Sequence, residues 1–250
     1  MLTLIRISCV KQRFIWFSLL SCVLLYHQVH ANESITVVTE DWPPYSYRLD
    51  NGDIGGIATE KIKQVLAKAD IPYTLNLYPW ARSYEMALTQ KNVLVYSIYR
   101  HDKREPLFHW LCPLLPKVKL YFFALVKNRH IEIKDIEDVR KYTVGLVRRE
   151  VAASFLKEKG FKEGKNLYFS ADDYINLNQL LKGQVDIIVT TAPSIKMRLK
   201  KLNKDFNQVK AFYLEELNAA TENCMAFNLN TSAELVDKVR RALKEINVVY

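Results

Sequence analysis

The feature that most constrains the fold is a regular alternation of strand-like and helix-like segments from residue 34 onward. Short runs rich in Val, Ile, Leu and Tyr are each followed by a stretch in which apolar residues recur at helical spacing. The first series is strand, helix, strand, helix, strand: "SITVVTE", "TEKIKQVLAKAD", "YTLNLY", "WARSYEMALTQ" and "VLVYSIY". Such alternation predicts an α/β architecture in which helices cover a mainly parallel sheet.

A second series of similar size begins near residue 134, with the strands "YTVGLV", "NLYFSA", "VDIIVTT" and "VKAFYLE". The tail then adds a strand, "CMAFNL", and a helix over 231–246 with a capping box from Thr231 to Glu234. Two series and a returning tail predict two lobes joined by two extended crossings, with a ligand cleft between them. We expect residues 32–118 with 222–250 to form the first lobe and 119–221 the second.

The N-terminus has the layout of a secretory signal peptide. A positive segment without acids precedes a thirteen-residue apolar stretch, "FIWFSLLSCVLLY", and "HQVHA" then ends in a small residue. A spanning helix needs about 20 apolar residues, so we expect residues 1–31 to be cleaved after Ala31 rather than kept as an anchor. A lipoprotein processed at Cys22 is the alternative. Either reading predicts export, and the periplasm is the expected location.

Charge and cysteine content restrict the partners. Without residues 1–31 the chain has 33 Lys+Arg and 27 Asp+Glu, a moderate and dispersed excess that does not favour nucleic acid. Its densest basic run, "KMRLKKLNK", fits the outer face of a helix. The remaining cysteines, Cys112 and Cys224, either form a disulfide in an oxidising compartment or stay free. The histidines form no ligand cluster with them, so no metal and no cofactor is expected.

The loops after the strands are the expected place for a binding site, because ligands of open α/β sheets lie beyond the carboxyl ends of the strands. The first of these loops, "EDWPPYSY", places Trp42, Tyr45 and Tyr47 around two prolines. Proline fixes φ and donates no hydrogen bond. The loop is therefore either a stiff aromatic wall facing a ligand or a turn whose rings pack beneath it.

The order of these segments resembles the bacterial extracellular solute-binding proteins of the amino-acid-binding type, the periplasmic partners of ABC importers. The resemblance covers nearly the whole chain after residue 31 and rests on "WPPYSY", "GGIATEKIKQVL", "SIYRHDKREPLFHW", "YTVGLVRREVAASFL" and "LKGQVDIIVTTAPS". It implies the two-lobe periplasmic-binding-protein fold of type II, with two hinge crossings at 117–128 and around 217–223.

The resemblance also implies roles for individual residues. Arg104 matches the arginine that holds a substrate carboxylate through a bidentate fork, a role that suits a guanidinium. Ser97 and Tyr99 match polar positions on the same strand end, and Tyr45 matches an aromatic that lies against the ligand. In the second lobe, Arg148 would face the cleft beside the N-terminus of a helix.

Two departures from the family pattern bear on the ligand. Thr190 and Thr191 stand after "VDIIV", where the family places an aspartate for the α-ammonium group, and Arg149 stands where glycine is common. Thr191 is then expected to complete the shell from the second lobe. Since several arginines follow strand ends, the sequence predicts a ligand richer in carboxylate than a plain amino acid. These arginines are Arg82, Arg100, Arg104, Arg148 and Arg149.

We therefore expect a monomeric, non-enzymatic protein that captures a small polar, carboxylate-bearing ligand for a membrane permease. Two alternatives remain open. The first is a stand-alone sensing module that uses the same cleft. The second is a small-molecule lyase or dehydratase derived from the same fold, for which Glu40, Asp41, Glu60 and Glu150 are candidate general acids, although no nucleophile–base motif is present.

Overall fold

The computed structural model describes residues 33–219 and 222–249. The predicted signal peptide, residues 1–31, lies outside the described residues, and so do residues 220–221 of the second predicted crossing. In the part of the chain that is described, no helix is long and apolar enough to cross a membrane.

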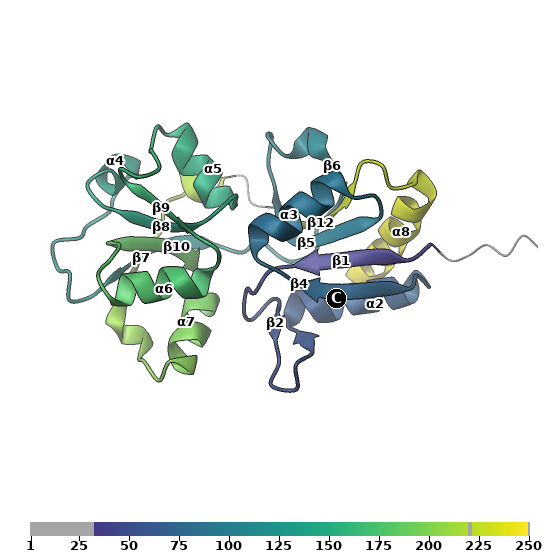
Figure 1. Cartoon of the computed structure of the whole chain (residues 1–250), viewed down its shortest axis with the longest axis horizontal. Helices are drawn as coiled ribbons and strands as arrows, with labels where there is room; N and C mark the ends of the chain where they lie inside the picture. Colours follow the sequence, from purple (N-terminus) through teal and green to yellow (C-terminus); the bar gives the residue numbers. More distant parts are fainter. Residues whose placement is uncertain (1–32, 220–221, 250) are drawn as a thin grey trace, which may run out of the picture. The chain divides into compact units, whose positions relative to one another are not determined.

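The first sheet has five strands in the order β4-β1-β5-β12-β6. Strand β1 pairs in parallel with β4 and β5, and β12 pairs antiparallel with β5 and β6. Strand β12 comes from the far end of the chain yet lies inside this sheet, as Figure 1 shows by its position beside β5. The strands are β1 (Ile35–Thr39), β4 (Tyr73–Leu77), β5 (Val93–Arg100), β6 (Phe108–Leu111) and β12 (Glu222–Asn228).

The second sheet also has five strands, in the order β11-β7-β10-β8-β9. Strands β10, β8 and β9 are parallel, and β7 is antiparallel to β10 and β11. The predicted α/β class, with two mainly parallel sheets flanked by helices, is confirmed. The strands are β7 (Leu120–Leu125), β8 (Val144–Val147), β9 (Leu167–Ser170), β10 (Ile187–Thr191) and β11 (Val209–Phe212).

Helices cover both faces of each sheet, because successive strand residues point to opposite sides. In the first sheet Val37 packs with α2 and α8, and its neighbour Val38 packs with α3. In the second sheet Val189 packs with α5, and Ile188 packs with α6 and α7. The helices are α2 (Ile57–Lys68), α3 (Trp80–Thr89), α4 (Ile136–Val139), α5 (Val151–Glu158), α6 (Asp173–Leu181), α7 (Ala192–Lys201) and α8 (Ala233–Val249). Short elements complete the fold: β2 (Tyr47–Arg48), β3 (Ile54–Gly55), η1 (Glu105–Leu107), η2 (Phe206–Gln208) and η3 (Glu216–Asn218).

The start of α8 differs from the predicted capping box. The hydroxyl of Ser232 accepts the backbone N–H of Leu235 at 3.4 Å, so serine takes the capping role. The hydroxyl of Thr231 instead accepts the N–H of Asn92, 3.2 Å away, in the residue just before β5. Thr231 therefore links the segment between β12 and α8 to the residue just before β5.

A β-bulge interrupts the pairing of β5 with β12. Ile98 pairs with Cys224 and Tyr96 with Met225, so Ser97 between them has no residue opposite. Ser97 has φ 61°, in the left-handed region that a residue with a Cβ seldom occupies. Bulges re-aim side chains next to functional sites, and this one lies two residues before Tyr99, near the carboxyl end of the strand.

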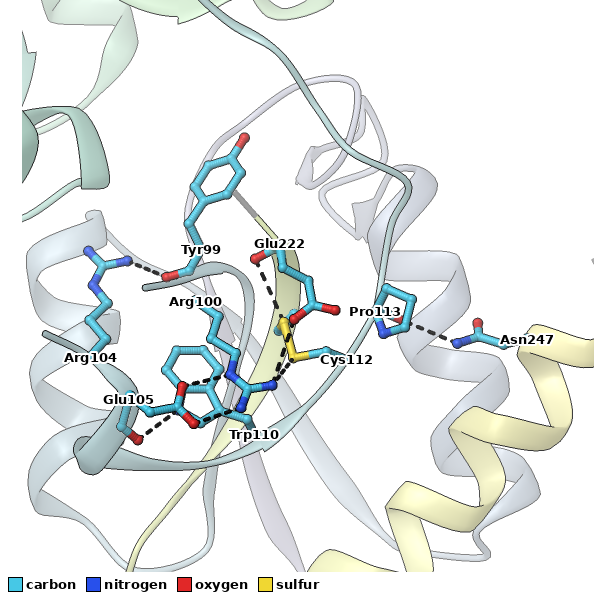
Figure 2. Close-up of a disulfide and its surroundings, with 10 residues drawn as sticks. Tyr99, Arg100, Arg104, Glu105, Trp110, Cys112, Pro113, Glu222 and Asn247 are labelled. Atoms are coloured by element: carbon cyan, nitrogen blue, oxygen red, sulfur yellow. Dashed lines mark hydrogen bonds and ion pairs between the residues drawn. A yellow bond between two sulfur atoms is a disulfide. The ribbon is translucent and has the colours of Figure 1, made fainter. Parts of the chain in front are cut away.

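Cys112 and Cys224 form a disulfide, with Cα atoms 4.6 Å apart. The bond joins the chain just after β6 to β12, at the end of the first sheet from which the crossing to β7 departs (Figure 2). Of the two sequence alternatives, the structure has the disulfide. Cys224 lies in β12 and Cys112 directly follows β6, so the bond ties the returning tail to an edge of the same sheet.

Candidate ligand-binding site

A small cavity lies where the carboxyl ends of the parallel strands meet the N-termini of the helices. Residues of both sheets line it, with strand ends β1, β5 and β10 and helix starts α3, α5 and α6 contributing. The lining residues are Glu40, Trp42, Trp80, Ser97, Tyr99, Arg104, Leu120, Glu150, Val151, Ala152, Asp173, Val189 and Thr190. This is where the topology of open α/β sheets places a ligand.

The free volume of this cavity is about 30 Å³, which has room for only a few water molecules. Pockets that hold small organic ligands are typically about 300–1,000 Å³. The side chains therefore nearly fill the cleft in this arrangement, and a larger ligand requires the cleft to widen.

Arg104 lies in the cavity with its guanidinium group enclosed. The side chain is 4% exposed, and its Nη1 and Nη2 atoms donate to the carbonyls of Tyr99 at 3.1 Å and Arg149 at 2.6 Å. The group also lies 5.5 Å from the ring of Trp80 and 5.0 Å from that of Tyr84. Burial lowers the pKa of Arg104 from its usual value, opposed by Tyr84 and Glu150. A guanidinium held in this way presents its remaining N–H groups in a fixed direction.

Ser97 and Tyr99 line the cavity beside Arg104, as the resemblance implies. Both side chains are buried, and neither hydroxyl has a hydrogen-bond partner among the described residues. The indole N–H of Trp80 is likewise buried without a partner in that part of the chain. Buried polar atoms are nearly always hydrogen-bonded, so these three atoms are suited to contact a polar ligand.

Three carboxylates face the same cavity: Glu40 follows β1, Glu150 precedes α5, and Asp173 is in the first turn of α6. Burial and the charge of Asp173 raise the pKa of Glu40 to about 8. Burial and the charge of Glu40 raise the pKa of Glu150 well above its usual value. Burial also raises the pKa of Asp173, against the opposing effects of Arg198 and of Thr190, whose hydroxyl donates to it at 2.8 Å.

The opening aromatic loop serves both of its expected roles, through different residues. Trp42 is 6% exposed and lines the cavity, and Tyr45 packs against it with ring centroids 4.2 Å apart. Burial raises the pKa of Tyr45, and the nearby Thr191 hydroxyl opposes that shift. Tyr45 and Thr191 are thus brought together, but they support the site rather than line it.

Four of the arginines expected near the ligand have other partners. Arg82 lies over the ring of Tyr78 at 4.0 Å. Arg100 pairs with Glu105 and Glu222, on the side of the strand away from Tyr99 (Figure 2). Arg148 pairs with Glu163 at 3.2 Å, and Arg149 pairs with Glu85. None of the four lines the cavity, so the structure does not bring Arg148 to the lining residues, where the resemblance led us to expect it.

Arg198 corrects another expectation. The run "KMRLKKLNK" places it among exposed lysines, yet its side chain is 6% exposed and its Nη1 atom lies 3.0 Å from Oδ2 of Asp41. Its Nη2 atom also donates to the carbonyl of Asp41. The helix α7 thus turns one basic side chain inward, to a partner on the loop after β1.

The three acidic residues of the cavity were not predicted from the sequence as ligand contacts. Glu40 and Glu150 entered only as candidate general acids, and Asp173 did not enter at all. The signal was present in "TEDW", "RREV" and "ADDY", which follow three strands in the same way as the arginine-bearing loops. The strand-end rule identifies acids there as readily as arginines.

Comparison with known proteins supports the architecture. No protein-family model matches the chain, and no curated protein sequence does. Among solved structures, the chain is similar to a histidine kinase sensor domain with similarity to periplasmic binding proteins (TM-score 0.74, 19% identity, 87% of this chain and 92% of that one). It is similar to the arginine-, lysine-, histidine-binding protein ArtJ from Geobacillus stearothermophilus (TM-score 0.74, 20% identity, 87% and 90%). It is also similar to holo ArgBP from T. maritima (TM-score 0.71, 14% identity, 86% and 90%). At these identities the likeness establishes the fold, which is the two-lobe fold of periplasmic binding proteins.

Proposed function

We propose that the chain is a periplasmic solute-binding protein that captures a small, amino-acid-like ligand between its two lobes. The observation that carries this proposal is the cavity at the strand ends, into which buried polar atoms are directed without partners in the described residues. A buried polar atom without a partner destabilises the folded protein, and a ligand that supplies a hydrogen bond removes this cost. The neighbours whose titles state a ligand bind arginine, lysine or histidine, which is consistent with this class.

Arg104 is the residue we assign to the carboxylate of the ligand, and Ser97 and Tyr99 supply hydroxyl contacts beside it. Trp42 and Trp80 form the apolar walls. Lobe 1 comprises residues 32–118 with 222–250, and lobe 2 comprises 119–221, so ligand contacts come from both. Residues 1–31 would direct the chain to the periplasm, and the proposed destination of the ligand is the permease of an ABC importer.

The binding role is tested by a thermal-shift screen with the twenty amino acids and simple diamines, followed by titration calorimetry on each compound that raises the melting temperature. Arg104→Ala should remove the response, whereas Arg82→Ala, on the surface of the same lobe, should keep it. If no compound shifts the melting temperature of the wild-type protein by more than about 2 °C, the proposal of an amino-acid-like ligand fails.

A sensing module is the second candidate, favoured by the likeness to a histidine kinase sensor domain. Both candidates need the same cleft and differ in what the ligand-bound protein contacts. Deletion of the gene should abolish uptake of the radiolabelled ligand if the protein serves an importer, and it should leave uptake intact if the protein is a sensor.

A lyase is the third candidate, favoured by the raised pKa values of Glu40 and Glu150 in the cavity, since a protonated carboxyl can act as a general acid. Proton NMR of the ligand after incubation with the protein distinguishes it. Recovery of unchanged ligand supports the binding role, and formation of a product supports the lyase.

A further inference from the structure

The cavity brings together more negative charge than its own cations balance. Glu40, Glu150 and Asp173 reach it from three separate elements, and Arg104 is the cation among the lining residues of the described chain. Two N–H groups of that guanidinium already donate to backbone carbonyls. When several carboxyl groups share a site of low dielectric constant, ionising all of them is energetically unfavourable.

The charged groups that act on Glu40 come from several separate elements. Asp173 faces it from α6, Arg198 from α7 and Arg104 from the segment before η1, and Asp41 is its neighbour in sequence. Glu150, which precedes α5, lines the same cavity, and the charge of Glu40 adds to burial in raising its pKa. Burial raises the pKa of Tyr99, in β5, and the charges of Glu40, Glu150 and Asp173 raise it further.

The two arginines near Glu40 only partly offset the cluster. Arg198 bonds to the carboxylate and carbonyl of Asp41 and Arg104 to two backbone carbonyls, and their charges lower the pKa of Glu40 by less than burial and Asp173 raise it. The alternative for a carboxylate in such a place is to keep a proton. The raised pKa values of the three groups agree with this.

An independent feature marks the cavity as a ligand site. The Ser97 hydroxyl is in a 4% exposed residue and the Trp80 indole N–H in a 2% exposed residue, and neither atom has a partner among the described residues. One oxygen of Asp173, Oδ1, is also buried and without a partner there. The bulge that aims Ser97 inward has a conformational cost, which fits a functional position.

Resting on the proposed function, we infer that the cleft selects ligands of net positive charge and that an ammonium or guanidinium group of the ligand replaces protons held by Glu40, Glu150 and Asp173. No covalent bond changes in this exchange. The displaced protons leave to the solvent, and the cationic group takes their place as partner of the carboxylates. A basic amino acid suits this set of charges, because its two cationic groups can pair with two of the three acids and its carboxylate with Arg104.

The exchange is tested by titration calorimetry with L-lysine, L-arginine, L-glutamine and L-glutamate at pH 6, 7, 8 and 9, in phosphate and in Tris buffer. L-Lysine or L-arginine should bind more tightly as the pH rises from 6 to 8, by up to about tenfold per pH unit for one proton released. The heat of binding should differ between the two buffers by their ionisation enthalpies. L-Glutamate should bind at least about a hundredfold more weakly than the cationic ligand.

A cationic ligand could bind with an affinity that does not depend on pH and a heat that does not depend on the buffer. That result overturns the proton exchange and leaves the proposed binding function standing. Equal or tighter binding of L-glutamate overturns the charge selectivity in the same way. Failure of L-lysine and L-arginine at every pH overturns the selection of basic ligands, whereas the proposed function is decided by the full screen and the protons by the measurement on the ligand-free protein.

The ligand-free protein gives that second measurement. A carboxyl whose pKa is raised in the folded state costs stability progressively as the pH rises from its unfolded pKa towards its folded pKa, here from about 4.5 to about 8. We therefore compare the fall in melting temperature between pH 6 and pH 9 in the two proteins. That fall should be roughly 5 °C smaller for Glu40→Gln than for the wild type. Glu60→Gln, at an exposed glutamate of α2 that pairs with Lys63, is the matched control and should follow the wild type. Parallel curves for all three proteins overturn the inference that the empty cleft holds protons.

Discussion

Removal of the disulfide between Cys112 and Cys224 should cost several kcal/mol of unfolding free energy. The bond closes a loop with a sequence separation of 112 residues, which contains every strand of the second sheet. In the chain-entropy relation a loop of that length lowers the entropy of the unfolded chain by about 16 cal/mol/K, or about 4.8 kcal/mol at 25 °C. Because unfolded chains retain some compactness, we expect a measured loss of about 3–5 kcal/mol.

The assay is urea unfolding followed by tryptophan fluorescence, on the oxidised wild type, on the wild type with a phosphine reductant, and on the double variant Cys112→Ala/Cys224→Ala. Reduction changes no other atom, so it separates the cross-link from the loss of packing around Cys224, which is fully buried. The slope of free energy against urea should rise slightly, because the unfolded chain without the cross-link exposes more surface.

The affinity for ligand should change by less than about threefold when the disulfide is removed, since Cys224 lies in β12, Cys112 directly follows β6 and neither lines the cavity. A loss of unfolding free energy below about 1 kcal/mol would refute the loop-entropy reasoning. A large loss of affinity with little loss of stability would show that the bond acts on the cleft instead.

Three further predictions concern single side chains. Arg104→Ala should weaken ligand binding by about 2–5 kcal/mol in titration calorimetry, because it leaves a buried charged partner unpaired. The control, Arg82→Ala, should change the binding free energy by less than about 0.5 kcal/mol. Equal effects of the two substitutions would remove Arg104 from the site. Arg198→Ala should lower the urea-derived unfolding free energy by about 1–3 kcal/mol, less than for a fully buried pair because the Asp41 carboxylate is 39% exposed. A double-mutant cycle with Asp41→Asn should give a coupling near 1 kcal/mol, and strict additivity would contradict the pairing. Ser97→Gly should raise stability by up to about 1 kcal/mol, because it relieves the left-handed backbone, and should weaken ligand binding several-fold; a change of the same sign in both assays would argue against a functional bulge.

The order of strands and helices could be predicted because it depends on local periodicity, which each segment shows without help from the rest. The ends of the strands could also be located, and with them Ser97, Tyr99 and Arg104. Their placement follows from topology, since the carboxyl ends of parallel strands share one edge of a sheet. Trp42 was covered by the same rule, through its place in the loop after β1.

The direction of the other arginines could not be predicted, because it depends on acids that are distant in sequence. Arg149 meets Glu85, 64 positions away, and Arg198 meets Asp41, 157 positions away. A basic residue on a helix turns inward only when such a partner exists, and one sequence does not reveal the pairing. The three cavity acids were underweighted for a different reason: a carboxylate beside a cleft was considered for catalysis and not for binding.

The contacts of Arg104 and Arg198 across the cleft have a consequence for the rate of ligand capture. Arg104 bonds to the carbonyl of Arg149, Arg198 bonds to Asp41, and the space between the lobes is nearly filled. We therefore expect the proposed ligand to enter only in the intervals when both contacts are broken. At low ligand concentration the observed association rate rises in proportion to concentration, but at high concentration it levels off at the frequency with which the cleft opens. The strength of these two contacts sets that ceiling, so the maximal association rate depends on Arg198 and Asp41, which do not line the cavity, as well as on Arg104, which does.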